Sequence, residues 1–257
     1  MKSPKLGILG GMGPLATVDF FHKLVNRTPA QFDHEHIPTI IHSVSQLPDR
    51  MQAIFDGGPS PLPKLLEAIE TLQAAGAVCI AMPCNTAHYW YDDFKPVLRV
   101  PFLHIADAAL EAIDGRQPSG SRLGLLGTRG TVKSGFYQRR FALRGVECLM
   151  SGPDDQHNLV DPAVAAVKAN RLDVATPLIE RAAKRLFDQG ASTVVLGCTE
   201  LPVVLNRFQP SLAARCVDVT VALADACIGW WRDNATTDHR VSGLSQSGVV
   251  TGYEASD

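Results

Sequence analysis

The chain has 257 residues, of which 46% are hydrophobic and 19% charged, with a formal net charge of -2. These values are typical of a globular protein large enough for one large domain or two small ones. The near-neutral charge, with no basic run longer than Arg139-Arg140, disfavours a nucleic-acid-binding surface. The chain lacks an apolar stretch of the roughly 20 residues that span a bilayer, and its glycine-broken start is too short for a signal peptide. We therefore expect a cytoplasmic protein that binds neither nucleic acid nor membrane.

Apolar runs alternate with helical patterns along the chain. Residues 6–9 predict a buried strand and residues 16–25 an amphipathic helix. The pattern continues with a strand at 37–44, a helix at 63–75 and further strands at 77–82 and 102–105. Because strands that alternate with helices form parallel sheets covered by helices, the sequence predicts an α/β fold.

An internal repeat divides the chain into two similar halves. LGILGGMG at residues 6–13 is matched by LGLLGTRG at 123–130, 117 residues later. GAVCIAMPC at 76–84 is matched by GASTVVLGC at 190–198, 114 residues later. Two matches in the same order at nearly equal offsets indicate a duplicated α/β unit. The repeat therefore predicts two pseudosymmetric domains and places Cys84 and Cys198 at equivalent positions.

The expected domain boundaries follow from the repeat. The first domain spans residues 1–105 and carries Cys84, and the second spans 106–211 and carries Cys198. Residues from about 212 to 233 are expected to return to the first domain, because CVDV resembles PFLHI of residues 101–105 at the same offset. Residues 234–257 are rich in Ser, Thr and Gly and predict a flexible tail.

The cysteine pattern argues against disulfides and zinc. Six cysteines are scattered at positions 79, 84, 148, 198, 216 and 227, without CxxC spacing. The cluster His34-Glu35-His36 lacks the i, i+4 spacing of a helical metal motif, so it predicts a turn. We expect no metal.

Cys84 and Cys198 each follow a hydrophobic strand and precede polar residues that begin a helix. Taken alone, a free cysteine is more often an inert core residue than a reactive thiol. The equivalent position of the second cysteine favours reactivity, since ligands of α/β proteins bind at the carboxyl ends of the strands. Two thiols facing one cleft suit the inversion of a stereocentre, in which one group removes a proton and the other delivers one to the opposite face.

Two other kinds of site fit the sequence less well. A cysteine protease could use His88, four residues after Cys84, but it gives no reason for the second cysteine. The segment from Gly11 to Ala16 formally fits the dinucleotide fingerprint G-x-G-x-x-A. The following strand leaves through Ser45-Gln46 rather than an acidic residue, so nucleotide binding is disfavoured and no cofactor is expected.

Several motifs resemble those of the cofactor-independent aspartate/glutamate racemases. They are GILGGMGPLATVDFF, DHEHIP, PDR, MPCNTAHYWYDD, LLGTRGTVKSGFYQ and LGCTELP, and they spread over most of residues 5–205. The resemblance implies a two-domain α/β fold, commonly dimeric, that racemises an amino acid with two cysteines and no cofactor. We therefore expect a homodimer whose active-site cleft lies between the domains.

The resemblance also assigns roles to individual residues. It implies that Cys84 and Cys198 are the acid-base thiols and that Arg50 and Lys168 hold a side-chain carboxylate of aspartate or glutamate. The α-carboxylate and amino group would be held by Met12, Asn85, Thr86, Thr128 and Thr199. Two alternatives stay open: a racemase or epimerase of broader specificity, and a non-catalytic amino-acid-binding relative.

Overall fold

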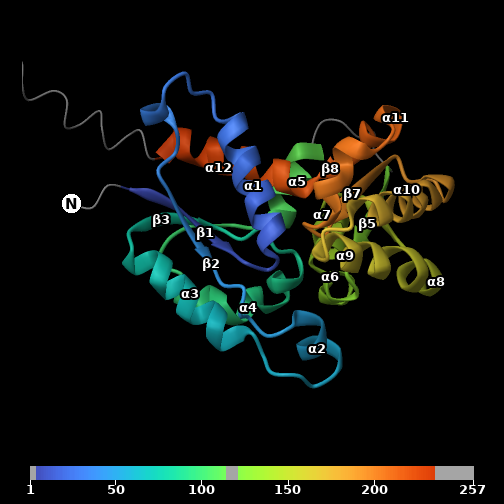
Figure 1. The fold of residues 1–257 in the computed structure, drawn as a ribbon, viewed down its shortest axis with the longest axis horizontal. Coiled ribbons are helices and arrows are strands. Elements are labelled where there is room, and N and C mark those ends of the chain that lie inside the picture. Colours follow the sequence, from blue (N-terminus) through green and yellow to red (C-terminus); the bar gives the residue numbers. More distant parts are fainter. Residues whose placement is uncertain (1–3, 114–120, 235–257) are drawn as a thin grey trace, which may run out of the picture.

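The computed structural model describes residues 4–113 and 121–234, which form two lobes, each built on a four-stranded parallel sheet (Figure 1). The strands of the first sheet are β1 (Lys5–Gly10), β2 (Thr39–Ser43), β3 (Ala77–Ala81) and β4 (Phe102–Leu103). Those of the second are β5 (Arg122–Gly127), β6 (Glu147–Met150), β7 (Thr193–Gly197) and β8 (Cys216–Asp218).

The two sheets have the same topology. Their strand orders are β2-β1-β3-β4 and β6-β5-β7-β8, and every neighbouring pair is parallel. Residues of β1 and β5 are buried beyond their first position, as expected of central strands covered on both faces. The duplicated α/β fold predicted from the repeat is thus confirmed, and β3 and β7 occupy equivalent places.

Helices cover both sheets. In the first half they are α1 (Pro14–Arg27), α2 (Arg50–Phe55), α3 (Leu62–Ala74), α4 (Tyr91–Phe94) and α5 (Ile105–Ile113). In the second they are α6 (Arg129–Ser134), α7 (Phe136–Leu143), α8 (Pro153–Asp155), α9 (Asp161–Lys168), α10 (Leu172–Asp188), α11 (Pro210–Ala213) and α12 (Val219–Asn234). Short 3₁₀ helices span Asp33–Glu35, Thr86–Trp90, Lys95–Val97 and Leu201–Arg207, and a π-helical turn spans Gln156–Val160.

The turn after β1 depends on a glycine. Gly11 has a φ of 91°, in the region that side-chain-bearing residues rarely adopt. A Cβ atom there would stand 2.5 Å from the backbone nitrogen of Val44. The N–H of Gly11 donates to the Thr17 hydroxyl at 2.8 Å, which ties the turn to α1. This turn brings the loop that follows β1 to the end of the sheet where the cysteines lie.

The terminal helix of each half packs on the other half. Helix α12 follows β8 but lies against α1, beside which it is drawn in red in Figure 1, and α5 follows β4 but contacts α7. The central core between the lobes therefore joins side chains of both sheets, such as Leu6, Ile8, Leu123 and Leu125. Each sheet also has an outer core on its face away from the other lobe.

The expected return of residues 212–233 to the first half needs a correction. Strand β8 pairs in parallel with β7, so it belongs to the second sheet. Helix α12 reaches the first half by packing on α1. Asp218, the last residue of β8, contacts the first half as well, because Lys23 of α1 bridges Asp19 and Asp218 at 2.5 and 2.7 Å. Main-chain hydrogen bonds place β8 in the second sheet, whereas the apolar face of α12 makes this helix pack on α1 of the first half.

In the part of the chain that the structure describes, no helix is both long and apolar enough to cross a membrane. The same residues contain no group of three or more His, Cys, Asp or Glu side chains arranged for a metal ion. The flexible tail is predicted for residues 234–257, and all of it beyond Asn234 lies outside the described residues.

Candidate active site

One cleft between the halves is lined by all nine residues that the sequence singled out. They are Met12, Arg50, Cys84, Asn85, Thr86, Thr128, Lys168, Cys198 and Thr199. Three residues that sequence reasoning missed complete the lining: Asp49, Met51 and Glu200. The repeat could have pointed to Glu200. This acidic residue stands two residues after Cys198, at the position that the uncharged Thr86 occupies after Cys84 in the first half.

The two cysteines come from equivalent elements. Cys84 follows β3 and Cys198 follows β7, and each thiol is 3% exposed. The helices after them are short 3₁₀ helices, Thr86–Trp90 and Leu201–Arg207, rather than α-helices. Backbone N–H groups at the starts of these helices still donate to the sulfur atoms, that of Ala87 to Cys84 and that of Glu200, the residue before the second helix, to Cys198. The duplicated strand ends thus present two buried thiols to one cleft.

The electrostatic surroundings of the thiols differ. Burial raises the pKa of the Cys84 thiol, and the nearby Arg50 guanidinium opposes that rise. Burial also raises the pKa of Cys198, to well above its usual range, and there the Glu200 carboxyl adds to the rise. The Sγ atom of Cys198 donates to Oε2 of Glu200 at 3.0 Å. The Cys198 thiol is therefore harder to deprotonate than the Cys84 thiol, although burial raises the pKa of both.

Hydrogen bonds join the halves beside the thiols. The hydroxyl oxygens of Thr86 and Thr128 are 2.8 Å apart, and Thr128 also accepts from the N–H of Thr131 as the N-cap of α6. The Tyr137 hydroxyl donates to Oδ1 of Asn85 at 2.7 Å. Because each pair takes one residue from each half, these contacts fix the two polar walls of the cleft relative to each other.

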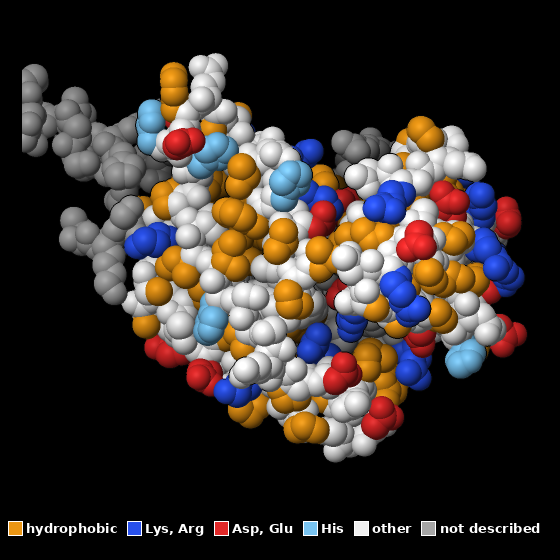
Figure 2. All heavy atoms as spheres, in the orientation of Figure 1, with side chains coloured by type: hydrophobic (Ala, Val, Ile, Leu, Met, Phe, Trp, Pro, Cys, Tyr) orange, Lys and Arg blue, Asp and Glu red, His pale blue; other side chains and the backbone are white. Residues whose placement is uncertain are grey.

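Two cationic side chains line the cleft. Arg50 is the first residue of α2, and Lys168 is the last of α9. The Asp49 carboxylate caps α2 by accepting from the N–H groups of Met51 and Gln52, at 2.8 and 3.0 Å. Figure 2 shows lysine and arginine side chains, in blue, gathered where the two lobes meet. The cleft is thus suited to bind an anionic group.

Two buried polar atoms of the cleft have no hydrogen-bond partner among the described residues. They are Nδ2 of Asn85 and Oε1 of Glu200, in side chains that are 1% and 5% exposed. Buried polar groups are nearly always paired, and leaving one unpaired costs about 1–3 kcal/mol. One is a donor and the other an acceptor, so together they suit a ligand that carries both kinds of group.

The cleft is closed in this structure. Its volume is about 20 Å³, the space of roughly one water molecule. A larger hollow of about 780 Å³ lies elsewhere, along α5, β8 and α12, and contains neither Cys84 nor Cys198. The chemistry-bearing groups lie in the small cleft, so the cleft must open to admit an amino acid.

A buried histidine holds the backbone of Cys84. The N–H of Ile105 donates to Nε2 of His88 at 3.4 Å, so the ring proton is on Nδ1, which donates to the Cys84 carbonyl at 2.8 Å. Burial lowers the pKa of His88 to about 4, and the ring is neutral near pH 7. Neutral His88 therefore positions Cys84 through its carbonyl and does not contact the thiol.

The fold and the site define a class of two-lobed α/β proteins that present paired thiols to a closed cleft lined by Arg50 and Lys168. The model of the Asp/Glu/hydantoin racemase family matches residues 9–227. The broad specificity amino-acid racemase RacX of Bacillus subtilis is 28% identical over 236 residues, covering 87% of this chain and 96% of that protein. A glutamate racemase of Corynebacterium kroppenstedtii is 26% identical, covering 81% of this chain and 68% of that protein.

Solved structures show the same fold. The aspartate racemase of Picrophilus torridus has a TM-score of 0.78 at 29% identity, covering 95% of this chain and all of that one. A glutamate racemase of Bacillus anthracis has a TM-score of 0.68 at 17% identity, covering 95% and 84% of the two chains, and supports the fold alone. The chain belongs to the Asp/Glu/hydantoin racemase family and is an amino-acid racemase.

Proposed function

We propose that this racemase interconverts L- and D-aspartate by two-base proton transfer between Cys84 and Cys198, without a cofactor. The observation that carries the proposal is the cleft itself, in which equivalent strand ends supply two buried thiols and Arg50 and Lys168 supply two positive charges. The likeness to an aspartate racemase at 29% identity supports the same substrate.

In the proposed reaction Cys84 begins as the thiolate and Cys198 as the thiol. For one enantiomer, Cys84 removes the α-proton from one face of the substrate while Cys198 delivers its proton to the other face. The electron pair released from the C–H bond is held on the α-carboxylate, to which Nδ2 of Asn85 is free to donate. For the opposite enantiomer the cysteines exchange roles, so no proton is gained or lost overall.

Substrate positioning follows from the rest of the lining. We assign the side-chain carboxylate to Arg50 and Lys168, because a planar guanidinium and an ammonium both pair well with carboxylates. The hydroxyl groups of Thr86, Thr128 and Thr199, with the loop at Met12, would hold the α-carboxylate and amino group. Glutamate, one methylene longer, is the secondary candidate substrate.

The experiment is racemisation in deuterated water. Loss of optical activity by L-aspartate, together with α-deuterium incorporation, is the expected result in the unmodified protein. Cys84→Ala and Cys198→Ala should each abolish racemisation, and Cys79→Ala, which changes a buried strand residue of β3, provides a matched thiol control. Full racemisation by either of the first two variants would refute the two-base assignment.

Broader specificity is the second candidate, favoured by the 28% identity to a broad specificity amino-acid racemase. Replacing the cations separates the two candidates. Arg50→Leu and Lys168→Met should each raise KM for aspartate at least about tenfold, the loss of one charged hydrogen bond, with little effect on a neutral amino acid. Faster turnover of neutral amino acids than of aspartate by the unmodified chain would favour the broad assignment.

Binding of aspartate without deuterium exchange would favour a non-catalytic role. The homodimer stays a prediction, which light scattering would check.

A further inference from the structure

Glu200 contributes a buried carboxyl group to the cleft that the proposed proton transfers do not use. Its side chain is 5% exposed, and its Oε2 accepts from the Cys198 thiol at 3.0 Å and lies 3.5 Å from the Thr199 hydroxyl. Its other oxygen, Oε1, has no hydrogen-bond partner among the described residues. A Cβ atom on Gly13 would stand 3.6 Å from Oε1, so this oxygen faces the loop that follows β1.

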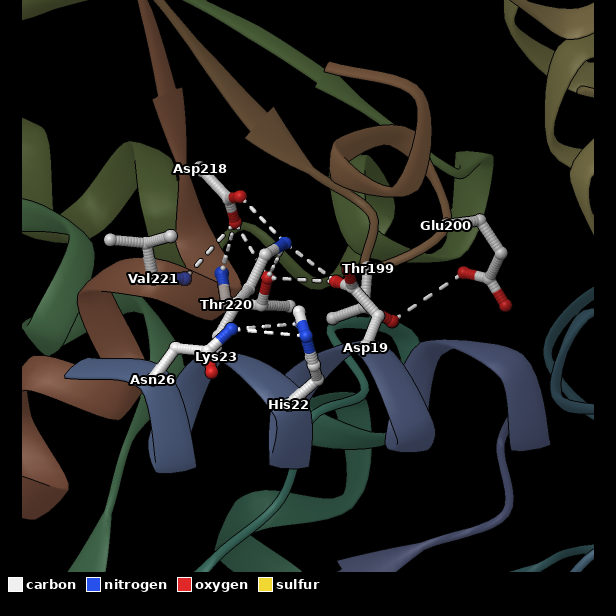
Figure 3. A network of polar contacts seen from close by, with 9 residues as sticks. All are labelled: Asp19, His22, Lys23, Asn26, Thr199, Glu200, Asp218, Thr220 and Val221. Atoms are coloured by element: carbon white, nitrogen blue, oxygen red, sulfur yellow. Dashed lines mark hydrogen bonds and ion pairs between the residues drawn. The ribbon is translucent and has the colours of Figure 1, made fainter. Parts of the chain in front are cut away.

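Glu200 forms no ion pair with a lysine or arginine of the described residues, although Arg50 and Lys168 line the same cleft. Figure 3 shows Glu200 apart from Lys23, the cation of the adjacent network, whose ammonium is bonded to Asp19 and Asp218. Among the described lining residues the other carboxyl group belongs to Asp49, whose Oδ1 accepts both capping bonds of α2 and whose negative charge is offset by nearby Lys168. Burying an unpaired carboxylate is costly, so Oε1 of Glu200 is the acceptor that a cationic ligand group would satisfy.

We propose that Glu200 binds the α-ammonium group of the substrate through Oε1. The proposal rests on the proposed function, since it takes an amino acid as the ligand. The unpaired donor of Asn85 and the unpaired acceptor of Glu200 then match the α-carboxylate and the α-ammonium of one molecule. Because Oε2 of the same carboxyl group contacts Sγ of Cys198, the bound ammonium lies beside the carbon that exchanges its proton.

This role also breaks the symmetry of the cleft. At the equivalent position in the first half, Thr86 bonds to Thr128 and carries no charge. Of the two equivalent positions after the cysteines, only the one beside Cys198 therefore offers a charged acceptor to an ammonium group, and the substrate binds in one orientation. A single orientation gives each cysteine a fixed face of the α-carbon, as two-base racemisation requires.

The test compares two dicarboxylates that differ by the ammonium group, L-aspartate and succinate. Calorimetry measures Kd for both ligands in the unmodified protein, in Glu200→Gln and in Glu67→Gln, a control on the exposed face of α3. Glu200→Gln should weaken aspartate binding by about 10- to 100-fold, the range for a hydrogen bond to a charged group. Succinate binding should weaken by less than about threefold or strengthen, and Glu67→Gln should change neither Kd.

The possible outcomes separate this inference from the proposed function. Equal weakening of both ligands would show a merely structural role, and unchanged aspartate binding would remove Glu200 from the site, so either result overturns the inference. If the unmodified protein binds neither ligand, the proposed substrate is wrong and the inference falls with it. If Glu200→Gln does not fold, a crystal structure of the unmodified protein with aspartate decides: Oε1 about 3 Å from the ammonium nitrogen supports the proposal, and a carboxyl group that contacts only protein overturns it.

Discussion

Acid should destabilise this protein through His88, a side chain that does not contact the thiols. Its ring is 2% exposed, lies 4.4 Å from the ring of His104, and uses Nε2 as an acceptor for the N–H of Ile105. Protonation would place a second N–H against that of Ile105 and a charge in an apolar site. Burial accordingly lowers the pKa of His88 to about 4, from an ordinary value of 6.5.

The sign and size of the effect follow from proton linkage. Between pH 6.5 and 4 the unfolded chain binds a proton at position 88 and the folded protein does not, so the folded state loses stability as the pH falls. From the ordinary value of 6.5 and the folded value of about 4, the loss of unfolding free energy is about 2 kcal/mol at pH 5 and about 3 kcal/mol at pH 4. Burial also lowers the pKa of His104, which adds loss in the same direction.

The assay is urea unfolding of the unmodified protein and of His88→Gln between pH 7 and 4.5. At pH 7 the variant should be less stable, because it disturbs the bond to the Cys84 carbonyl. The stability gap should shrink by about 2 kcal/mol on going to pH 5, since the variant has no imidazole to protonate. A gap that stays constant with pH would refute the reasoning, because titrating groups away from His88 act on both proteins alike.

Three further predictions concern the cleft. Tyr137→Phe should lower the unfolding free energy by about 1–3 kcal/mol, because it leaves the buried Oδ1 of Asn85 without a donor, as urea unfolding would show. Gly130→Ala should cost a similar amount, about 1–3 kcal/mol, and raise KM, because its Cβ would stand 2.8 Å from a side-chain carbon of the opposite half. Iodoacetamide should alkylate Cys84 before Cys198, as mass spectrometry of short reactions would show, because only the second thiol donates to a carboxyl oxygen.

Matched variants define what would contradict these predictions. Tyr89→Phe removes a hydroxyl from a side chain that is 39% exposed, and Gly152→Ala adds a methyl group where no heavy atom lies within 4 Å. If Tyr137→Phe or Gly130→Ala behaves like its control, the contacts between the halves carry no measurable energy. If the two thiols react at equal rates, the asymmetry of their surroundings has no chemical effect.

Sequence reasoning went furthest where the signal is local. The hydrophobic run at 77–82 contains β3, and the pattern at 63–75 contains nearly all of α3. It was weaker around position 50, where the sequence predicts no helix between residues 44 and 63, whereas Arg50 opens α2 behind the Asp49 cap. A six-residue helix spans less than two full turns, so its apolar periodicity is too short to detect.

The sequence by itself determined the duplicated α/β plan and the position of a thiol at the end of one strand in each half. Local hydrophobicity predicts the strands and turns, and the internal repeat predicts the duplication, so neither feature needs information about contacts between distant segments. Only the tertiary structure decided that α12 packs on α1, that β8 pairs with β7, and that Glu200 faces the loop after β1 with one oxygen unpaired. These features depend on side-chain packing and backbone pairing between segments far apart in the chain, which no local pattern encodes.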